Sequence, residues 1–266
     1  MEPILHNRLP VAAWADPRTA RLPGIQPLVR ADWLLVDEAY APQMALRDRL
    51  IAEHPDEVHA LLPGAEDAAA ELLETVLGDL AAREGFAVGA DSARRPDGVE
   101  VVLDRSAPLL TLGRLVQADF CLMERPEGAT EHVLTGAILC FPSSWTLAQK
   151  LGRPLGAIHA PVARYDAEIA RRVQRLFDAI RPEAPLWRVN ALHYLDPALY
   201  QPRREYEEKR KGGTRSPFLR AERQALLRLP ESGAVVFSIH TWQVALENLT
   251  PEQSAALAAR PVETIG

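Results

Sequence analysis

The residue with the clearest potential for metal chemistry is His159, in the segment Ile158-His159-Ala160-Pro161-Val162. A proline-flanked loop restricts its side chains, and a neutral imidazole held in this way can ligate iron or another metal. Upstream, Ser143 or Ser144 is expected to cap a short helix over 145–150, which Gly152 would end in a left-handed conformation. The alternative is a histidine that only hydrogen-bonds its own loop, and spacing alone favours that structural role.

A second polar group comprises Arg220, Glu222 and Arg223. Ser216-Pro217 resembles a helix start, so a helix is expected over 216–229, and two arginines three positions apart would converge on one side of it. Paired guanidinium groups facing a cavity suit carboxylates, because arginine can bind them in bidentate fashion. A solvated helix face, with pairing to Glu222 or nearby acids, is the alternative that the sequence by itself favours.

Other polar residues are weaker candidates. Asp119 lies in a segment expected to form a strand, where a carboxylate is unusual, so it is either a site residue or a solvent-facing one. His132, His193 and His240 are further possible ligands. The sequence contains no Walker loop, dinucleotide-binding glycine fingerprint, HExxH or GxSxG. Any chemistry must therefore come from a bound cofactor or from a site without a short motif.

The bulk composition limits the class of protein. The chain has 266 residues, 47% of them hydrophobic, and a formal net charge of -6. That charge gives no general attraction to nucleic acid or an anionic membrane. Two cysteines are too few for a disulfide framework or a thiolate zinc site. No apolar run reaches membrane-spanning length, and residues 1–3 begin no signal peptide, so a cytoplasmic protein is expected.

The elements that must position these residues follow from hydrophobic spacing. Helices are expected over 67–83 and 165–180, besides the one over 216–229. Segments rich in Val, Leu, Ile, Phe and Thr predict strands, with a hairpin across 124–131; they are 99–104, 109–125, 132–142 and 234–246. Residues 1–30 are expected to form an irregular arm. The pattern predicts an α+β fold with a mostly antiparallel sheet and surrounding helices, in a single domain over 1–266.

Taken together, these segments resemble the DUF3445 family, whose members are similar to the haem-dependent oxidative N-demethylase α subunit. The resemblance runs through most of the chain, and its most specific blocks are IHAPV at 158–162 and RAERQALLRLPESGAVVFSI at 220–239. Further matching blocks are 23–28, 37–40, 69–77, 115–119, 141–145 and 150–152.

The resemblance implies a PAS-like fold that holds b-type haem, with an oxygen-binding face beside a small-amine pocket. The activity that it implies is NADPH-dependent oxidation of dimethylamine to methylamine and formaldehyde. Flavin mononucleotide (FMN), a [2Fe-2S] cluster and tetrahydrofolate are expected on partner subunits only. This chain has no cysteine set for an iron–sulfur cluster, so it would need a redox partner.

Carried over to this sequence, the resemblance suggests His159 as the proximal iron ligand. Arg220 and Arg223 would anchor haem propionates or set the polarity of the pocket, and Trp145 would contact the haem. Glu222 would have a polar distal role, and Glu222 or Asp119 would accept a cationic amine.

The sequence departs from the family pattern in two places. Residue 118 is Ala where an acid is common, and Asn190-Ala191 stands where Asn-Trp is usual. We expect either change to alter the pocket, so that its substrate can differ from dimethylamine. The leading hypothesis is oxidative N-demethylation of a small secondary amine through a carbinolamine that releases formaldehyde. The alternatives are a non-catalytic haem-binding PAS-like sensor or carrier, and a haem-free structural relative.

Overall fold

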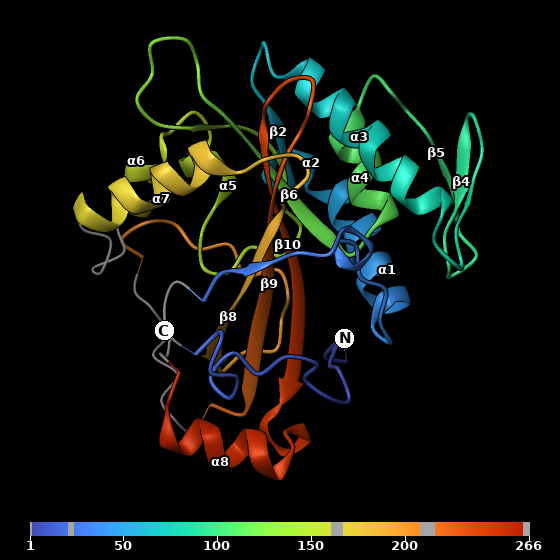
Figure 1. Cartoon of the computed structure of the whole chain (residues 1–266). Coiled ribbons are helices and arrows are strands. Elements are labelled where there is room, and N and C mark those ends of the chain that lie inside the picture. Colours follow the sequence, from blue (N-terminus) through green and yellow to red (C-terminus); the bar gives the residue numbers. More distant parts are fainter. Residues whose placement is uncertain (1, 21–23, 161–166, 208–215, 263–266) are drawn as a thin grey trace.

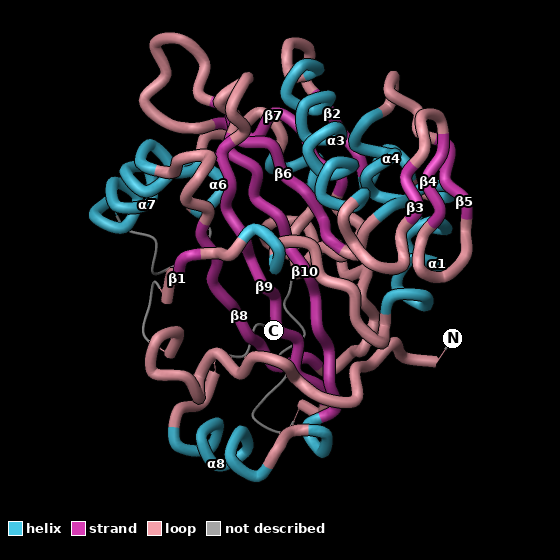
Figure 2. Tube along the Cα trace, turned by 45° about the vertical axis from the view of Figure 1, so that its right-hand side comes forward, coloured by secondary structure: helices cyan, strands magenta, loops and turns pink. Residues whose placement is uncertain are grey.

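A mostly vertical antiparallel sheet forms the centre of the molecule (Figures 1 and 2). The computed structural model describes residues 2–20, 24–160, 167–207 and 216–262. Within them, seven strands pair in the order β1-β8-β9-β10-β6-β7-β2, and every pairing between neighbours is antiparallel. The strands are β1 (Gln26–Pro27), β2 (His59–Leu61), β6 (Ala118–Glu124), β7 (Val133–Ile138), β8 (Leu186–Tyr194), β9 (Phe218–Arg228) and β10 (Val235–Ala245).

The connection of β6 to β7 confirms the predicted hairpin across 124–131, and β10 confirms the predicted strand over 234–246. The order of the strands in the sheet differs from their order along the chain. After the β6–β7 hairpin the chain passes through helices, then returns as β8, β9 and β10, and β10 lies beside β6. The long strands β8, β9 and β10 therefore form a continuous surface next to that hairpin.

The predicted helix over 216–229 is wrong, because residues Phe218–Arg228 form the long strand β9. Good helix formers such as Ala, Leu, Arg and Gln fill this segment, but helix propensity is a weak prior that tertiary context overrides. β9 lies between β8 and β10 and pairs with both along its length. The backbone hydrogen bonds of two ladders favour the strand, and one of its faces buries the apolar side chains of Leu219, Ala221, Ala225 and Leu227.

One face of the sheet packs on α1 (Tyr40–Glu53), α2 (Pro55–Val58), α3 (Glu66–Ala81) and α4 (Pro108–Leu115). The helix α3 confirms the prediction over 67–83. The strand predicted over 109–125 is wrong in its first half, which is α4. Pro108 occupies the first turn of α4, and Leu109, Leu112 and Leu115 recur at helical spacing as fully buried side chains.

The other face of the sheet packs on α5 (Leu147–Lys150), α6 (Leu155–His159) and α7 (Ala167–Ala179). Gly152 has a positive φ of 74°, as predicted. The serine caps are not present, because α5 begins after Thr146 and neither Ser143 nor Ser144 caps it. α7 confirms the helix predicted over 165–180 from residue 167 onwards; residues 165 and 166 lie outside the described residues.

The ends of the chain close the lower part of the sheet. The irregular arm predicted for residues 1–30 is confirmed where it is described, apart from β1 and the start of the short helix η1 (Arg30–Asp32). The arm forms a third apolar cluster with η2 (Leu246–Asn248), α8 (Pro251–Ala259) and the strands. A separate three-stranded sheet, β3 (Ala87–Val88), β4 (Ser92–Arg94) and β5 (Glu100–Val102), lies outside α3 and α4. These elements confirm the α+β class.

Candidate functional site

Polar side chains gather on the sheet face that α5, α6 and α7 cover. Side chains of a strand alternate between the two faces, and cross-strand partners share a face. Arg188 of β8 pairs in register with Gln224 of β9, and Asn190 pairs with Glu222. Arg220 belongs to the same alternate set on β9. A run of polar residues on this scale, inside a sheet covered by helices, is unusual for a region with only a packing role.

His159 is the last residue of α6, and its side chain is half-buried. The sequence predicts a loop here, and the helix is the correction; Pro161 and Val162 lie outside the described residues. The ring Nδ1 lies 2.9 Å from the carbonyl oxygen of Leu155. Burial lowers the pKa of His159 below its usual value; the Leu155 carbonyl opposes this, and the positive charges of Lys150 and Arg188 reinforce it. The imidazole is therefore neutral near pH 7, which is the form that ligates a metal.

Lys150 fixes the helix that carries His159. Its Nζ donates to the carbonyl oxygen of Ile158 at 2.7 Å and pairs with the Glu205 carboxylate at 2.5 Å. Lys150 is buried, and the backbone N–H of Glu205 donates to the side chain of Gln149 at 2.9 Å. These contacts join α5, α6 and the segment before residue 208. We refer to Lys150, Ile158 and Glu205 as the Lys150 clamp.

Arg220 and Glu222 form a buried pair on the polar face. An Nη of Arg220 lies 3.2 Å from Oε1 of Glu222, and the same guanidinium donates to the carbonyl oxygens of Phe141 and Leu199. Gln224 donates to the other oxygen of Glu222 at 3.3 Å. The pairing with Glu222 was the expected alternative for Arg220. Glu222 is held as a fixed carboxylate whose oxygens can accept further hydrogen bonds.

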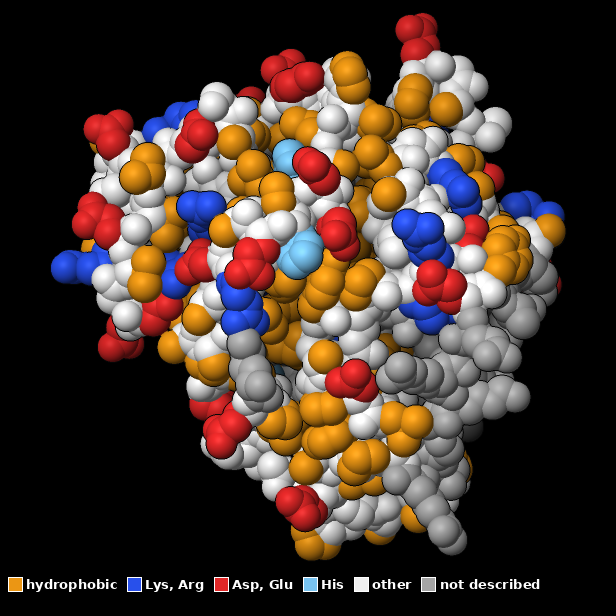
Figure 3. Space-filling model, turned by 180° about the vertical axis from the view of Figure 1, so that it is seen from behind, with side chains coloured by type: hydrophobic (Ala, Val, Ile, Leu, Met, Phe, Trp, Pro, Cys, Tyr) orange, Lys and Arg blue, Asp and Glu red, His pale blue; other side chains and the backbone are white. Residues whose placement is uncertain are grey.

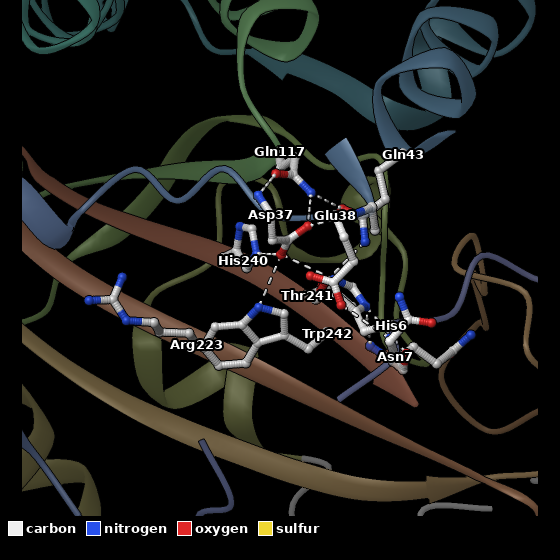
Figure 4. A network of polar contacts seen from close by, with 12 residues as sticks. His6, Asn7, Asp37, Glu38, Gln43, Gln117, Arg223, His240, Thr241 and Trp242 are labelled. Atoms are coloured by element: carbon white, nitrogen blue, oxygen red, sulfur yellow. Dashed lines mark hydrogen bonds and ion pairs between the residues drawn. The ribbon is translucent and has the colours of Figure 1, made fainter. Parts of the chain in front are cut away.

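Arg223 lies on the opposite face of the sheet, so the predicted convergence with Arg220 is wrong. In a strand, residues three apart point to opposite faces, whereas in a helix they share one. The guanidinium of Arg223 lies 5.1 Å from the ring centre of Trp187 and donates to the carbonyl oxygen of Trp33 at 3.2 Å. Figure 4 shows it reaching away from the polar network on that face.

Asp119 is held by the backbone and by one arginine. Its carboxylate accepts from Arg47 at 2.6 Å and from the backbone N–H groups of Cys140 and Phe141 at 2.8 and 3.0 Å. Asp119 and Arg47 are 1% and 0% exposed in their side chains. This geometry ties α1 to the start of β6 and to the segment after β7, and it does not bring Asp119 to His159.

The remaining predicted residues are distributed between the two faces. Trp145 and Ile158 both pack against the apolar cluster that α5, α6 and α7 form with the sheet. His132 contacts Gln174 and Phe177. His193 pairs in register with Leu219, on the face opposite to Glu222.

His240 lies in a network that the sequence reasoning missed (Figure 4). Oδ2 of Asp37 accepts from the ring Nε2 of His6 at 3.0 Å and of His240 at 2.8 Å, and from Nε1 of Trp242 at 3.2 Å. Oδ1 accepts from Gln117 at 2.8 Å. The partners lie far apart in sequence, so no local spacing could reveal them. We refer to this group as the Asp37 network.

Arg188 is the other residue that the sequence reasoning missed. It is half-buried, and its buried Nε has no hydrogen-bond partner among the described residues. The available signal was the alternation in Leu186–Tyr194, where Arg188 and Asn190 are the polar residues two positions apart.

A family model described as "Haem-dependent oxidative N-demethylase, alpha subunit-like" matches residues 24–265. The chain belongs to this family. The match includes β8, β9, β10 and all three helices over the polar face. The family name gives haem as the cofactor and oxidative N-demethylation as the activity, and "alpha subunit" implies that other subunits exist.

The residues on the polar face fit a haem. In the described residues, no group of three or more His, Cys, Asp or Glu could hold a metal ion by itself. A haem does not need such a group, because its porphyrin supplies most iron ligands and the protein adds axial ones. The neutral His159 offers an axial ligand, apolar side chains lie beside it, and the unpartnered Nε of Arg188 offers a donor for an anionic group.

The surface of this family member is mixed in character. On the side seen in Figure 3, acidic, basic and hydrophobic side chains are interspersed over the residues drawn in colour. Because charges of both signs are mixed, the electrostatic potential on this side has no strong long-range component of either sign. Among the described residues, each helix is too short or too polar to cross a bilayer.

Proposed function

We propose that the protein catalyses haem-dependent oxidative N-demethylation of a small secondary amine of the dimethylamine type. The family match over residues 24–265 carries this proposal. Its local support is the arrangement of His159, Arg188 and Glu222 around one covered face of the sheet. Electrons come from a partner reductase, since the two cysteines of this chain are both buried and cannot form a cluster site.

His159 is the proximal ligand in this proposal. Its Nδ1 faces the Leu155 carbonyl, which favours the tautomer with a proton on Nδ1 and the lone pair on Nε2. The Lys150 clamp holds the last turn of α6, and Trp145 and Ile158 belong to the apolar surroundings of this helix. When bound, the haem supplies the iron at which oxygen is reduced and activated.

Glu222 is the residue that receives the cationic amine. A substrate ammonium group in a covered site needs an anionic acceptor, because an unpaired buried charge is costly. Glu222 is buried, and Arg220 and Gln224 fix its orientation. Its oxygens can accept hydrogen bonds from the ammonium group and hold the amine in place. Asp119 is committed to Arg47, so Glu222 is the better acceptor of the two.

The overall reaction balances with external electrons. One atom of O2 enters an N-methyl C–H bond to give a carbinolamine. Two electrons and two protons reduce the other atom to water. The carbinolamine then breaks its C–N bond, which releases formaldehyde and the primary amine. Partner subunits that carry FMN, a [2Fe-2S] cluster and tetrahydrofolate would deliver the electrons and take up the formaldehyde.

The fold proposal is a single cytoplasmic PAS-like haem domain with an N-terminal arm. The strand order supports the PAS-like part: a hairpin, then helices, then three antiparallel strands of which the last returns beside the first. That arrangement places α5, α6 and α7 over one face of the five strands β6 to β10. Glu222 lies on this face, and His159 lies on α6.

The test is an absorbance spectrum of protein reconstituted with haem, for wild type, His159→Ala and His132→Ala. The proposal expects a Soret band in wild type that is shifted or lost in His159→Ala and retained in His132→Ala. With a reductase, wild type should produce formaldehyde from dimethylamine, and Glu222→Gln should lower that rate by about 100-fold or more. A Soret band without any turnover of small amines would favour the haem sensor or carrier. No band would overturn the haem assignment.

A further inference from the structure

Arg188 differs from the fully buried arginines of this chain. Arg47, Arg95 and Arg220 each donate to backbone carbonyl groups and pair with at least one carboxylate. Arg188 makes no hydrogen bond or ion pair with the described residues, although it is half-buried and its Nε is fully covered. A guanidinium in this condition has donors that neither water nor protein satisfies completely.

The surroundings of Arg188 do not supply its missing anion. Burial lowers the pKa of Arg188, and the negative charge of Glu222 opposes that effect. Glu222 already accepts from Arg220 and from Gln224, so its attraction for Arg188 acts over a distance without direct contact. Retaining a partly desolvated cation costs stability, and such a residue is expected where a ligand brings the counter-charge.

The position of Arg188 indicates which ligand brings that charge. Arg188 lies on the sheet face that α6 covers, and His159 is the last residue of α6. Its register partner on β9 is Gln224, which lies two residues from Glu222. A substrate ammonium would be repelled by a guanidinium, whereas a carboxylate matches its planar donors in bidentate fashion.

We propose that Arg188 binds a propionate carboxylate of the haem whose iron His159 ligates. This inference rests on the proposed function, because it requires haem on this face of the sheet. It assigns to Arg188 the role that the sequence suggested for Arg220 and Arg223. Arg220 is committed to Glu222 and two carbonyl groups, and Arg223 lies on the other face.

The experiment compares haem with haem dimethyl ester, in which the propionates carry no charge. Dissociation rates are measured by transfer of haem to excess apomyoglobin, and affinities for both haems by absorbance titration, for wild type, Arg188→Gln and Arg188→Lys. Arg172→Gln, on the exposed side of α7, is the matched control. We expect Arg188→Gln to weaken haem binding roughly 10- to 100-fold, as for loss of a charge-assisted hydrogen bond. Arg188→Lys should fall between wild type and Arg188→Gln, and Arg172→Gln should match wild type.

The ester separates a direct contact from a structural effect. Wild type should bind the ester more weakly than haem, and in Arg188→Gln most of that difference should vanish. The haem-free Arg188→Gln protein should melt at the same temperature as wild type or higher, since no native bond is removed. Equal haem affinity in wild type and Arg188→Gln, or equal losses with haem and ester, would overturn the assignment of Arg188. Failure of wild type to bind haem would instead overturn the proposed function and this inference with it.

Discussion

Asp37, beside the sheet face opposite to His159, accepts hydrogen bonds from four side chains, those of His6, Gln117, His240 and Trp242. Burial alone would raise its pKa, but the hydrogen bonds from His240 and His6, together with their charges, hold the pKa well below its usual range. The folded chain therefore favours ionised Asp37. An amide in its place would present an NH2 group to donors that already point at this position, which leaves them unsatisfied.

We predict that Asp37→Asn lowers the free energy of unfolding by roughly 3 kcal/mol at pH 7. Because the folded pKa lies below the unfolded value of 3.8, the stabilisation from Asp37 is fully present above about pH 4 and is lost as pH falls through the folded pKa. Urea unfolding between pH 7 and pH 3 measures both effects. Wild type should lose more stability than Asp37→Asn below pH 4. The exposed Asp91→Asn is the control, and a loss in Asp37→Asn no larger than its loss would contradict the prediction.

The residues of β9 show that the direction of a side chain depends on whether its segment forms a helix or a strand. The sequence identified Arg220, Glu222 and Arg223 as a polar group, and all three are buried. It could not show which of them share a face, because a strand, with a side-chain period of 2, and a helix, with a period of 3.6, point the same residues in different directions. Arg188 was missed for the same reason: its role depends on a neighbouring strand, and its register partner Gln224 lies 36 positions away in sequence.

At the scale of elements, the short helices α5 and α6 depend on tertiary contacts. Helices of four and five residues are not stable alone, so side-chain contacts must fix them. The Lys150 clamp fixes α6, because Nζ of the buried Lys150 donates to the carbonyl oxygen of Ile158, the residue before His159. The position of the proposed iron ligand therefore depends on a lysine whose Nζ is bound to Ile158 and Glu205.

We predict that Lys150→Met lowers the free energy of unfolding by about 3 kcal/mol, because it leaves the Glu205 carboxylate and the Ile158 carbonyl without their buried donor. Haem dissociation should accelerate severalfold, and the Soret position should shift as the angle of the imidazole becomes less fixed. Arg153→Gln removes a more exposed partner that lies 3.4 Å from the same carboxylate, so its effect should stay within about 1 kcal/mol. Equal effects of the two variants would show that burial of Lys150 is not what fixes α6.

Helices and strands could be predicted from the sequence where the hydrophobic residues followed a single periodicity, either that of a helix or that of a strand. α3 has a clear apolar stripe, and the β6–β7 hairpin has a turn-rich connection between apolar segments, so both were predicted from the sequence. α4 and β9 were not, since Leu-rich and Ala-rich segments fit either structure until their neighbours are known. The pairing of β9 with β8 and β10 decides the matter for β9, and the paired residues lie up to 40 positions apart.

At the scale of the whole molecule, the N-terminal arm connects the sheet to the C-terminal helix. Leu9 and Trp14 are buried against Trp242 and Val244 of β10. Nε1 of Trp14 donates to the carbonyl oxygen of Gln253 in α8 at 2.9 Å. The arm thus covers the lower part of the face opposite to His159. Prolines and isolated apolar anchors indicated an ordered arm, but not the surface on which it packs.

We predict that removal of residues 2–9 lowers the free energy of unfolding by at least roughly 3 kcal/mol, because it exposes the surface under Leu9 and removes His6 from the Asp37 network. The point variant His6→Ala should account for only part of that loss, since it keeps Leu9 in place. The polar face with His159 lies on the other side of the sheet. At low temperature, where the truncated chain is still folded, its Soret band and haem affinity should therefore equal those of wild type. Urea unfolding and haem titration of the three proteins measure both quantities. A truncated chain that is as stable as wild type would mean that the arm packs too weakly to support the sheet. A truncated chain that is folded but has lost haem affinity would mean that the two faces are coupled through β9 and β10.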